Sequence, residues 1–215
     1  MADCPFPKEV TARYNIAPPG PAWSLRYHPH CGHQEWTPLI WGLVPSWHKA
    51  GREIRPAINA RIESAADKPT FRGPMRHHRC LIPATGFYEW SGKQPYYFHD
   101  QENRILALAA LYDCWLSPDG SEVETFCLLT TRANSVMRPI HHRMPVIIAP
   151  EDYEAWLDPS DQRASHLTKR LNPDPASRLI AHPVSPAVNT ATQDDPCLIE
   201  PVKSTPRQAT LFDER

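Results

Sequence analysis

The chain has 215 residues with 23 basic and 24 acidic side chains, so its formal net charge at neutral pH is −1. Hydrophobic residues make up 41% and charged residues 22% of it, which excludes a disordered or fibrous chain and indicates a globular protein with a core. The 25 prolines, against 8 glycines, favour short elements and irregular connections over long helices.

Positive charge is concentrated in one part of the chain. Between residues 49 and 79, eight lysines and arginines stand against three acidic residues, a local excess of five. Such a band favours binding of an anionic ligand at one place over general adhesion to anions. A solvated basic face without a ligand explains the same pattern equally well.

The cysteines and the N-terminus bear on location. The six cysteines include no C-x-x-C pair, and Asp3, Lys8 and Glu9 stand where a signal peptide needs its apolar segment. The longest apolar run, Ile105 to Tyr112, is too short to span a bilayer. We therefore expect a cytoplasmic, reducing location and no membrane association.

Residues 28–33 raise the question of a metal site, because three histidines and Cys31 lie within six positions. Zinc sites usually draw on two separated ligand pairs, and no second pair is present. A polar hairpin loop is the preferred interpretation. We expect neither a metal nor a cofactor.

In the first third of the chain, a short strand-like piece over 13–20 ends in a Pro-Pro-Gly turn. Two strands are predicted to follow it, over 23–27 and 35–41. A helix is predicted to begin within 65–71.

Further along, β-branched and aromatic residues predict core strands over 96–99, 105–115 and 125–130. Pro118-Asp119-Gly120 predicts a hairpin turn. After it we expect a short helix over 131–138, stopped by Pro139, and a buried strand over 146–149. Two surface helices are expected over 151–157 and 162–171, and a last short strand over 182–185.

No internal repeat and no long linker divides the sequence. A single α+β domain is therefore predicted over residues 1–202. Residues 203–215 are mostly polar and are expected to form a disordered tail.

The stretch Cys80 to Trp90 predicts a strand that enters a turn, because it begins apolar and is broken by Pro83 and Gly86. Glu89 stands between two aromatic residues, which would hold water off its carboxylate. Desolvation raises the pKa of a carboxyl group and makes it a usable proton acceptor near neutral pH. The alternative is a half-exposed glutamate beside core aromatics.

Six motifs occur along the chain in a fixed order and together carry a family resemblance. They are Arg-Tyr-Asn-Ile-Ala-Pro (13–18), Trp-Gly-Leu-Val-Pro-Ser-Trp (41–47), Asn-Ala-Arg-Ile-Glu-Ser (59–64), Cys-Leu-Ile-Pro-Ala-Thr-Gly-Phe-Tyr-Glu-Trp (80–90), Ile-His-His-Arg-Met-Pro (140–145) and His-Pro-Val-Ser (182–185). The chain resembles the SOS response-associated peptidase (SRAP) family, the abasic site processing proteins. The resemblance implies an α+β domain that is mainly antiparallel β, in a barrel-like sheet with short flanking helices.

The resemblance also implies a DNA-damage function. Members bind single-stranded DNA that contains an abasic site, on the nucleoid in a bacterial cell. The α-amine of an N-terminal cysteine condenses with the sugar aldehyde, and its thiol closes a thiazolidine. A lyase side reaction and removal of the first methionine belong to the same site. Two other functions stay open for this chain: a non-catalytic single-strand binding module and, from the older family label, a cysteine peptidase.

Three polar residues within these motifs are the expected catalytic groups. Glu89 would take protons from the attacking amine or thiol, and His141 would donate one to the sugar ring oxygen. Asn59 would orient the nucleophile and a sugar hydroxyl. The expected DNA-binding residues are Arg61, Trp47, Arg143, Arg72 and Pro18.

Each of these residues also has a structural explanation. Asn59 would cap a turn, His141 would be a core histidine, and Arg61 would pair with Glu63. The recurrence of all of them inside the motifs favours the functional interpretation.

The start of the chain departs from the family pattern, in which Met-Cys-Gly-Arg precedes the Tyr-Asn motif by about twenty to thirty residues. Here Met-Ala-Asp-Cys stands at the start, and Cys4 is followed by Pro5. A thiazolidine needs an amine and a thiol on one terminal residue, so this polypeptide as written is not expected to form one. We favour a true start further upstream over a truncated relative that only binds, and over exposure of Cys4 by proteolysis.

The tail contains Gln208, Leu211 and Phe212 in a spacing similar to the peptide by which bacterial repair proteins dock on the DNA polymerase sliding clamp. Adjacent large apolar side chains on a polar segment suit a hydrophobic pocket. The sliding clamp is therefore an expected partner, beside abasic single-stranded DNA. The alternative is a tail that folds back onto the domain.

Overall fold

A computed structural model describes residues 4–28, 32–49, 53–161 and 178–202. Strands dominate it. They are β1 (Pro21–Tyr27), β2 (Gln34–Trp41), β3 (Asn59–Arg61), β4 (Arg79–Ala84), β5 (Gly86–Ser91), β6 (Gln94–Asp100), β7 (Leu106–Leu116), β8 (Glu122–Arg132), β9 (Arg143–Pro145), β10 (Ile147–Ile148) and β11 (Leu179–Pro183). The helices are short: α1 (Ile62–Ala65), α2 (Pro69–His77), α3 (Tyr153–Leu157), and the 3₁₀ turns Pro150–Asp152, Pro186–Asn189 and Pro196–Ile199.

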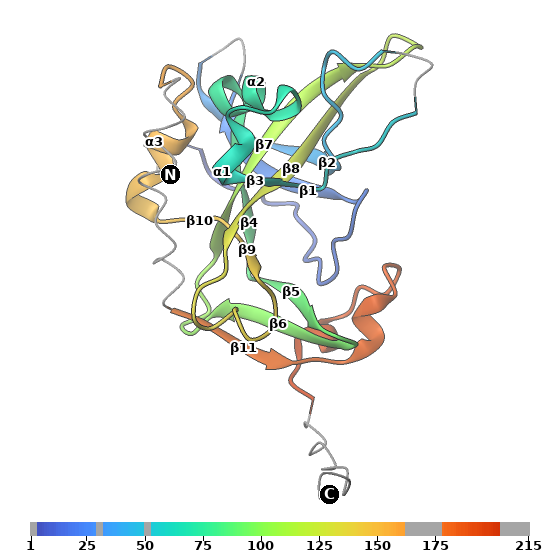
Figure 1. Cartoon of the computed structure of the whole chain (residues 1–215), viewed down its shortest axis with the longest axis vertical. Coiled ribbons are helices and arrows are strands. Elements are labelled where there is room, and N and C mark those ends of the chain that lie inside the picture. Colours follow the sequence, from blue (N-terminus) through green and yellow to red (C-terminus); the bar gives the residue numbers. More distant parts are fainter. Residues whose placement is uncertain (1–3, 29–31, 50–52, 162–177, 203–215) are drawn as a thin grey trace, which may run out of the picture.

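The larger sheet closes into a barrel. Neighbouring strands run in the order β7-β4-β1-β2-β8, and β8 pairs again with β7. The sheet is mixed, because β2 and β3 run parallel to β8, whereas the other pairings are antiparallel. This confirms the expected α+β domain with a barrel-like sheet and short flanking helices, and Figure 1 shows α1 and α2 on the barrel.

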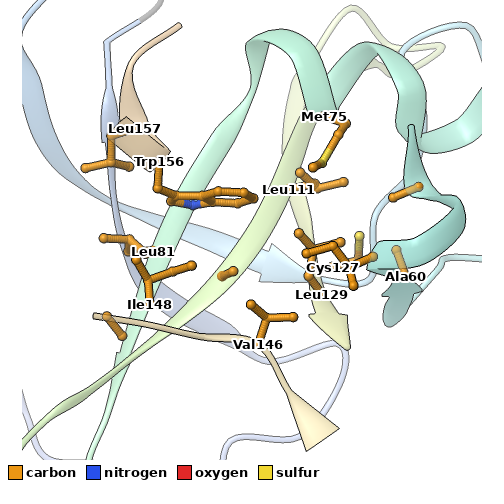
Figure 2. Packing of buried hydrophobic residues seen from close by; sticks show 14 of the residues in the cluster. Ala60, Met75, Leu81, Leu111, Cys127, Leu129, Val146, Ile148, Trp156 and Leu157 are labelled. Carbon is orange, nitrogen blue, oxygen red and sulfur yellow. The ribbon is translucent and has the colours of Figure 1, made fainter. Parts of the chain in front are cut away.

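Strand β7 explains the longest apolar run of the sequence. Its residues 107, 109 and 111 belong to one buried cluster and its residues 106, 108, 110 and 112 to another, because successive side chains of a strand point to opposite faces. A strand buried on both faces has no polar alternation. Figure 2 shows the first cluster, in which Trp156 of α3 lies between Leu81, Leu111 and Leu157.

A second sheet, in the order β11-β6-β5, forms the other end of the molecule (Figure 1). Phe87 and Phe98 pair across it, with stacked rings 5.3 Å apart, and both pack in the second cluster. Its opposite face carries Tyr97, which packs against Val184, Val188 and Leu198. Phe87 and Tyr88 of β5 pack, partly buried, against the clusters on the two faces, which holds β5, the strand of Glu89, in place.

Most strand predictions are confirmed, with boundaries shifted by a few residues. One strand prediction and one helix prediction are wrong: residues 13–20 form no strand, although they end in the expected turn, and residues 131–138 form no helix. Thr131 and Arg132 instead pair with β9 at the end of β8, and the residues after them form turns up to Pro139. The predicted helix over 162–171 and the centre of the 28–33 loop lie outside the described residues.

The helix predicted to begin within 65–71 is confirmed by α2, which begins at Pro69. The elements predicted near positions 146 and 151 are shorter or displaced. The expected strand 146–149 is reduced to β10, and the helix expected over 151–157 becomes a 3₁₀ turn followed by α3. Within the part of the chain that the structure describes, no helix has the length and apolar content to cross a bilayer.

Candidate functional site

A cavity of about 1250 Å³, the first cavity, is lined by residues of the barrel, of β5 and β6, and of the segment 10–18. The three expected catalytic residues, Asn59, Glu89 and His141, all line it. So do three of the expected DNA-binding residues, Arg61, Arg143 and Pro18. Asn59 and His141, which are 82 positions apart in the sequence, thus line the same cavity.

Glu89 and His141 form the polar pair of this cavity. Glu89 lies in β5, and its Oε1 is 3.5 Å from Nδ1 of His141. Burial raises the pKa of the Glu89 carboxyl, and the positive charge available on His141 opposes that rise. A carboxylate that holds its proton more tightly than usual is a stronger base, which suits proton transfer near neutral pH.

The imidazole of His141 is held by its own chain. Its Nδ1 lies 2.9 Å from the carbonyl oxygen and 3.3 Å from the amide nitrogen of Arg143. When Nδ1 carries a proton it donates to that carbonyl and lies beside Glu89. The ring therefore has a set orientation, with Nδ1 toward Arg143 and Glu89.

Asn59 and Arg61 are placed by the short strand β3, which runs parallel to β8. Ala60 between them is buried in the core, whereas Asn59 and Arg61 are exposed, because alternate residues of a strand face opposite sides. Asn59 lies inside the strand and does not cap a turn, since the residue before α1 is Arg61.

Arg143 is held by Glu63 and by the strand beside it. Its two terminal nitrogens each lie 2.8 Å from one carboxylate oxygen of Glu63, and it also donates to the carbonyl of Thr130. The hydrogen bonds from Arg143 hold the pKa of Glu63 below its usual value. Glu63 thus pairs with Arg143, and not with Arg61 as the structural explanation of Arg61 had assumed. The Nε of Arg143 is buried and has no partner among the described residues.

A further cation, Arg132, was not singled out in the sequence. It lies at the end of β8, directly opposite Arg143 of β9, and residues directly opposite in an antiparallel pair share a face. Thr130 lies two residues earlier on the same face and is opposite Arg61 of β3 in the neighbouring pairing. Three arginines thus stand on one face of β3, β8 and β9, a signal that only the strand register reveals.

The segment with the Tyr-Asn motif forms a wall of the first cavity. The Asn15 side chain is 6% exposed, and its amide nitrogen lies 3.1, 3.2 and 3.0 Å from the carbonyl oxygens of Val188, Thr190 and Gln193. Tyr88, next to Glu89, donates from its hydroxyl to the carbonyl of Tyr14, at 2.7 Å. The motif therefore ties the C-terminal part of the domain to β5.

We expect Asn15→Ala to lower the free energy of unfolding by about 1–3 kcal/mol, because it leaves the buried carbonyl group of Val188 without its donor. Urea-induced unfolding, followed by circular dichroism, measures this change. Gln193→Ala is the matched control: it retains the backbone carbonyl and removes only an exposed side chain, which usually changes stability by less than about 0.5 kcal/mol. Equal stability of the two variants would contradict the anchoring role of Asn15.

Two predicted DNA-binding residues lie elsewhere. Trp47 and Arg72 line a smaller cavity of about 440 Å³, the second cavity, beside α2. The structure does not bring them together with Asn59, Glu89 and His141. The predicted clamp-binding residues Gln208, Leu211 and Phe212 lie outside the described residues.

Cys4 does not line either cavity. It packs against the first core cluster, and its carbonyl accepts a hydrogen bond from Nε1 of Trp36 at 3.0 Å. The other cysteines that the structure describes do not line either of these two cavities. Among the described residues, therefore, no thiol accompanies Glu89 and His141.

Known proteins match most of this chain. Residues 4–191 match the family model described as SOS response associated peptidase (SRAP). The abasic site processing protein YoqW of Bacillus subtilis (strain 168) is 38% identical over 167 residues, which cover 75% of each chain. The abasic site processing protein YedK of Escherichia coli (strain K12) is 31% identical over 206 residues, covering 93% of this chain and 89% of that protein. A crystal structure of a protein from Bacteroides thetaiotaomicron matches with a TM-score of 0.71 and 30% identity, over 89% of this chain and 82% of that one.

Proposed function

The chain belongs to the SOS response associated peptidase (SRAP) family, and on this premise we propose that it binds single-stranded DNA at an abasic site and processes the exposed sugar in the first cavity. Relatives at 38% and 31% identity are abasic site processing proteins. The observation that carries the proposal is the pairing of Glu89 with His141, 3.5 Å apart, in a cavity that also holds Asn59.

The proposed first step opens the abasic sugar, which is a cyclic hemiacetal. Glu89 takes the proton of the C1′ hydroxyl as the bond between C1′ and O4′ breaks. The electron pair stays on O4′, which takes a proton from Nε2 of His141. The product is the open-chain aldehyde with a C4′ hydroxyl, and the protein returns to its starting state when Glu89 releases its proton to solvent and Nε2 of His141 takes one up from solvent. Asn59 offers a donor and an acceptor to hold a sugar hydroxyl.

Arginines around the cavity would hold the strand. Arg61 is exposed on β3 and lines the first cavity, so its guanidinium is the group placed to bind a phosphate. Each phosphate bound by a cation releases a counterion, so the logarithm of the affinity falls with the logarithm of salt concentration by about 0.7 per contact on a single strand. Arg61→Gln is therefore expected to reduce the salt dependence of binding as well as the affinity.

A second candidate function is a binding module without covalent chemistry. It is favoured by one observation, the position of Cys4 outside the first cavity. Capture of the aldehyde as a thiazolidine needs an α-amine and a thiol on the same terminal residue. Cys4 packs outside the first cavity, which supports the binding module.

The two candidates are separated by measuring binding and product on the same strands. Affinities for an abasic strand and for an intact strand of equal length are compared, and the abasic reaction is then run on a denaturing gel. Tighter binding of the abasic strand together with a covalent adduct or a cleaved strand supports processing. Tighter binding without either product supports the binding module, and equal affinity for both strands overturns the proposal for the first cavity.

A further inference from the structure

The imidazole of His141 is oriented by the backbone of Arg143. His141 lies in the irregular segment before β9, and Arg143 is the first residue of that strand. The carbonyl oxygen and the amide nitrogen of Arg143 lie 2.9 and 3.3 Å from Nδ1 of His141. A rotation of the peptide units around Arg143 would therefore move the imidazole relative to Glu89, whose Oε1 lies 3.5 Å from the same nitrogen.

Strand β9 by itself gives this backbone a weak anchor. It has three residues, Arg143–Pro145, and pairs with the end of β8. Its last residue is a proline, which has no N–H group to donate. Because the ends of short strands open more easily than their centres, the position of Arg143 depends on the contacts of its side chain.

Glu63 of α1 supplies the main contact of that side chain. The two terminal nitrogens of Arg143 each lie 2.8 Å from one carboxylate oxygen of Glu63, and one of them also donates to the carbonyl of Thr130. Two parallel bonds fix the relative orientation of a guanidinium and a carboxylate, which a single bond does not. The Arg143 side chain is 15% exposed, so little water competes for these bonds.

The carboxylate of Glu63 stands on a firm support. Glu63 is the second residue of α1, and its neighbours Ile62 and Ala65 in this helix are buried in the first core cluster. Helix α1 directly follows β3, the strand that carries Asn59. The pair of Glu63 with Arg143 thus joins the two chain segments that bring Asn59 and His141 to the first cavity.

We propose that Glu63 is a positioning residue for the reaction: through Arg143 it sets the orientation of the His141 imidazole beside Glu89. Glu63 does not line the first cavity, so it acts through Arg143 and not on the sugar. The inference rests on the proposed function, because the step that it supports is the transfer of a proton from His141 to the ring oxygen. A small displacement of a reacting group costs up to about a hundredfold in rate.

The first test is Glu63→Gln, which keeps the size of the side chain and removes its charge and one of its two acceptors. We expect the maximal single-turnover rate on an abasic strand to fall about tenfold to a hundredfold. The protein concentration that gives half of this rate should not rise, because Arg61 in the cavity is unaltered. Glu53→Gln is the matched control, since it makes the same change in the exposed pair of Glu53 with Arg55, and it should leave both quantities unchanged.

A double-mutant cycle tests whether Glu63 acts through Arg143. Arg143→Lys keeps the positive charge but has one terminal nitrogen and does not form the two parallel bonds. In this background Glu63→Gln should change the rate by less than about threefold, because the contact that it removes is already lost. An equal loss in both backgrounds would show that Glu63 acts on another group, contrary to the inference.

Nitrogen NMR of the imidazole measures the orientation without the reaction. When the ring is neutral, His141 of the unaltered protein should show one tautomer, with the proton on Nδ1 and bound to the carbonyl of Arg143. Glu63→Gln should show a mixture of both neutral tautomers, and Glu53→Gln should show the single one. A single Nδ1 tautomer in Glu63→Gln would mean that the ring keeps its orientation without Glu63, and the inference would then be wrong.

The outcomes distinguish this inference from the function on which it rests. If Glu63→Gln processes abasic strands as fast as Glu53→Gln, Glu63 is not a positioning residue, and the proposed function stands. If its rate falls only in proportion to a smaller folded fraction in circular dichroism, Glu63 is merely structural and the inference is overturned. If the unaltered protein forms no product, the proposed function fails, and the tautomer of His141 still decides whether Glu63 orients the ring.

Discussion

Glu89→Gln is expected to lower the rate of abasic-site processing by about 10²–10⁴-fold, the usual contribution of a positioned acid or base. Glutamine has nearly the same shape as glutamate but does not take up the proton of the sugar hydroxyl. The ion pair that Glu89 forms with a protonated His141, 3.5 Å away, is lost as well, because the amide carries no charge. Binding should change much less than the rate, since Glu89 is not one of the cations that hold the phosphates.

The rate is measured in single turnover, with protein in excess over a labelled abasic strand, by quantifying adduct and cleaved strand on a denaturing gel. Glu53→Gln is the control, because Glu53 is an exposed carboxylate paired with Arg55 and does not line the first cavity. A Glu89→Gln variant that processes the abasic strand as fast as Glu53→Gln would remove Glu89 from the mechanism.

The pH dependence of the same reaction follows from the raised pKa of Glu89. A base acts only when it is deprotonated, so the rate should rise with pH through the pKa of the folded state, which burial places above the usual value near 4.3. In Glu89→Gln this rise should disappear. A rate that is independent of pH over this range in the unaltered protein would contradict a basic role for Glu89.

Stability should change in the opposite sense to activity. Because the folded protein holds the Glu89 proton more tightly than the unfolded chain, this residue favours the folded state at low pH, and that contribution is lost as pH rises through the folded pKa. Glu89→Gln should therefore be more stable than the unaltered protein above that pKa. The difference should vanish below about pH 4, where both states carry the proton.

Local sequence patterns predicted a strand well where burial of its side chains accounts for its sequence. The unbroken apolar run of β7 indicated a buried strand, and burial on both of its faces is the reason for that run. The helix expected over 131–138 was wrong because long-range pairing decided the outcome. Thr131 and Arg132 bind to β9, and the sequence of this segment does not show that a partner strand follows it.

The motifs named the residues of the candidate site in advance, but only part of their arrangement could be predicted. No periodicity links Asn59, Glu89 and His141 in the sequence. Only the order of the motifs that contain them suggested that they act together. The structure places all three around one cavity. The pairing of Arg143 with Glu63 and the position of Arg132 depend on the register of β3, β8 and β9. Trp47 carried a stacking prediction from its residue type, and its separation from the first cavity follows from the tertiary structure.

Gly86→Ala is expected to lower the free energy of unfolding by about 3 kcal/mol, at the upper end of the usual cost of overpacking. A methyl group on Gly86 would lie nearer than 3.0 Å to the carbonyl oxygen of Phe98 and to the ring of Tyr97. The Phe98 carbonyl is backbone of the neighbouring strand β6 and has no freedom to move aside. Tyr97 is 6% exposed, and its hydroxyl donates to Thr85 at 3.1 Å.

Urea-induced unfolding of Gly86→Ala and of Gly73→Ala makes a matched comparison, because both replace glycine by alanine. In the helix α2, with open space at the new methyl group, the change should be neutral or stabilising by up to about 1 kcal/mol. Equal stability of the two variants would mean that β5 and β6 move apart to accommodate the methyl group without any loss of free energy of unfolding. Since Glu89 lies three residues along β5 from Gly86, a shift of this strand should also move its carboxylate relative to His141. We therefore expect the folded fraction of Gly86→Ala to process abasic strands more slowly than Gly73→Ala.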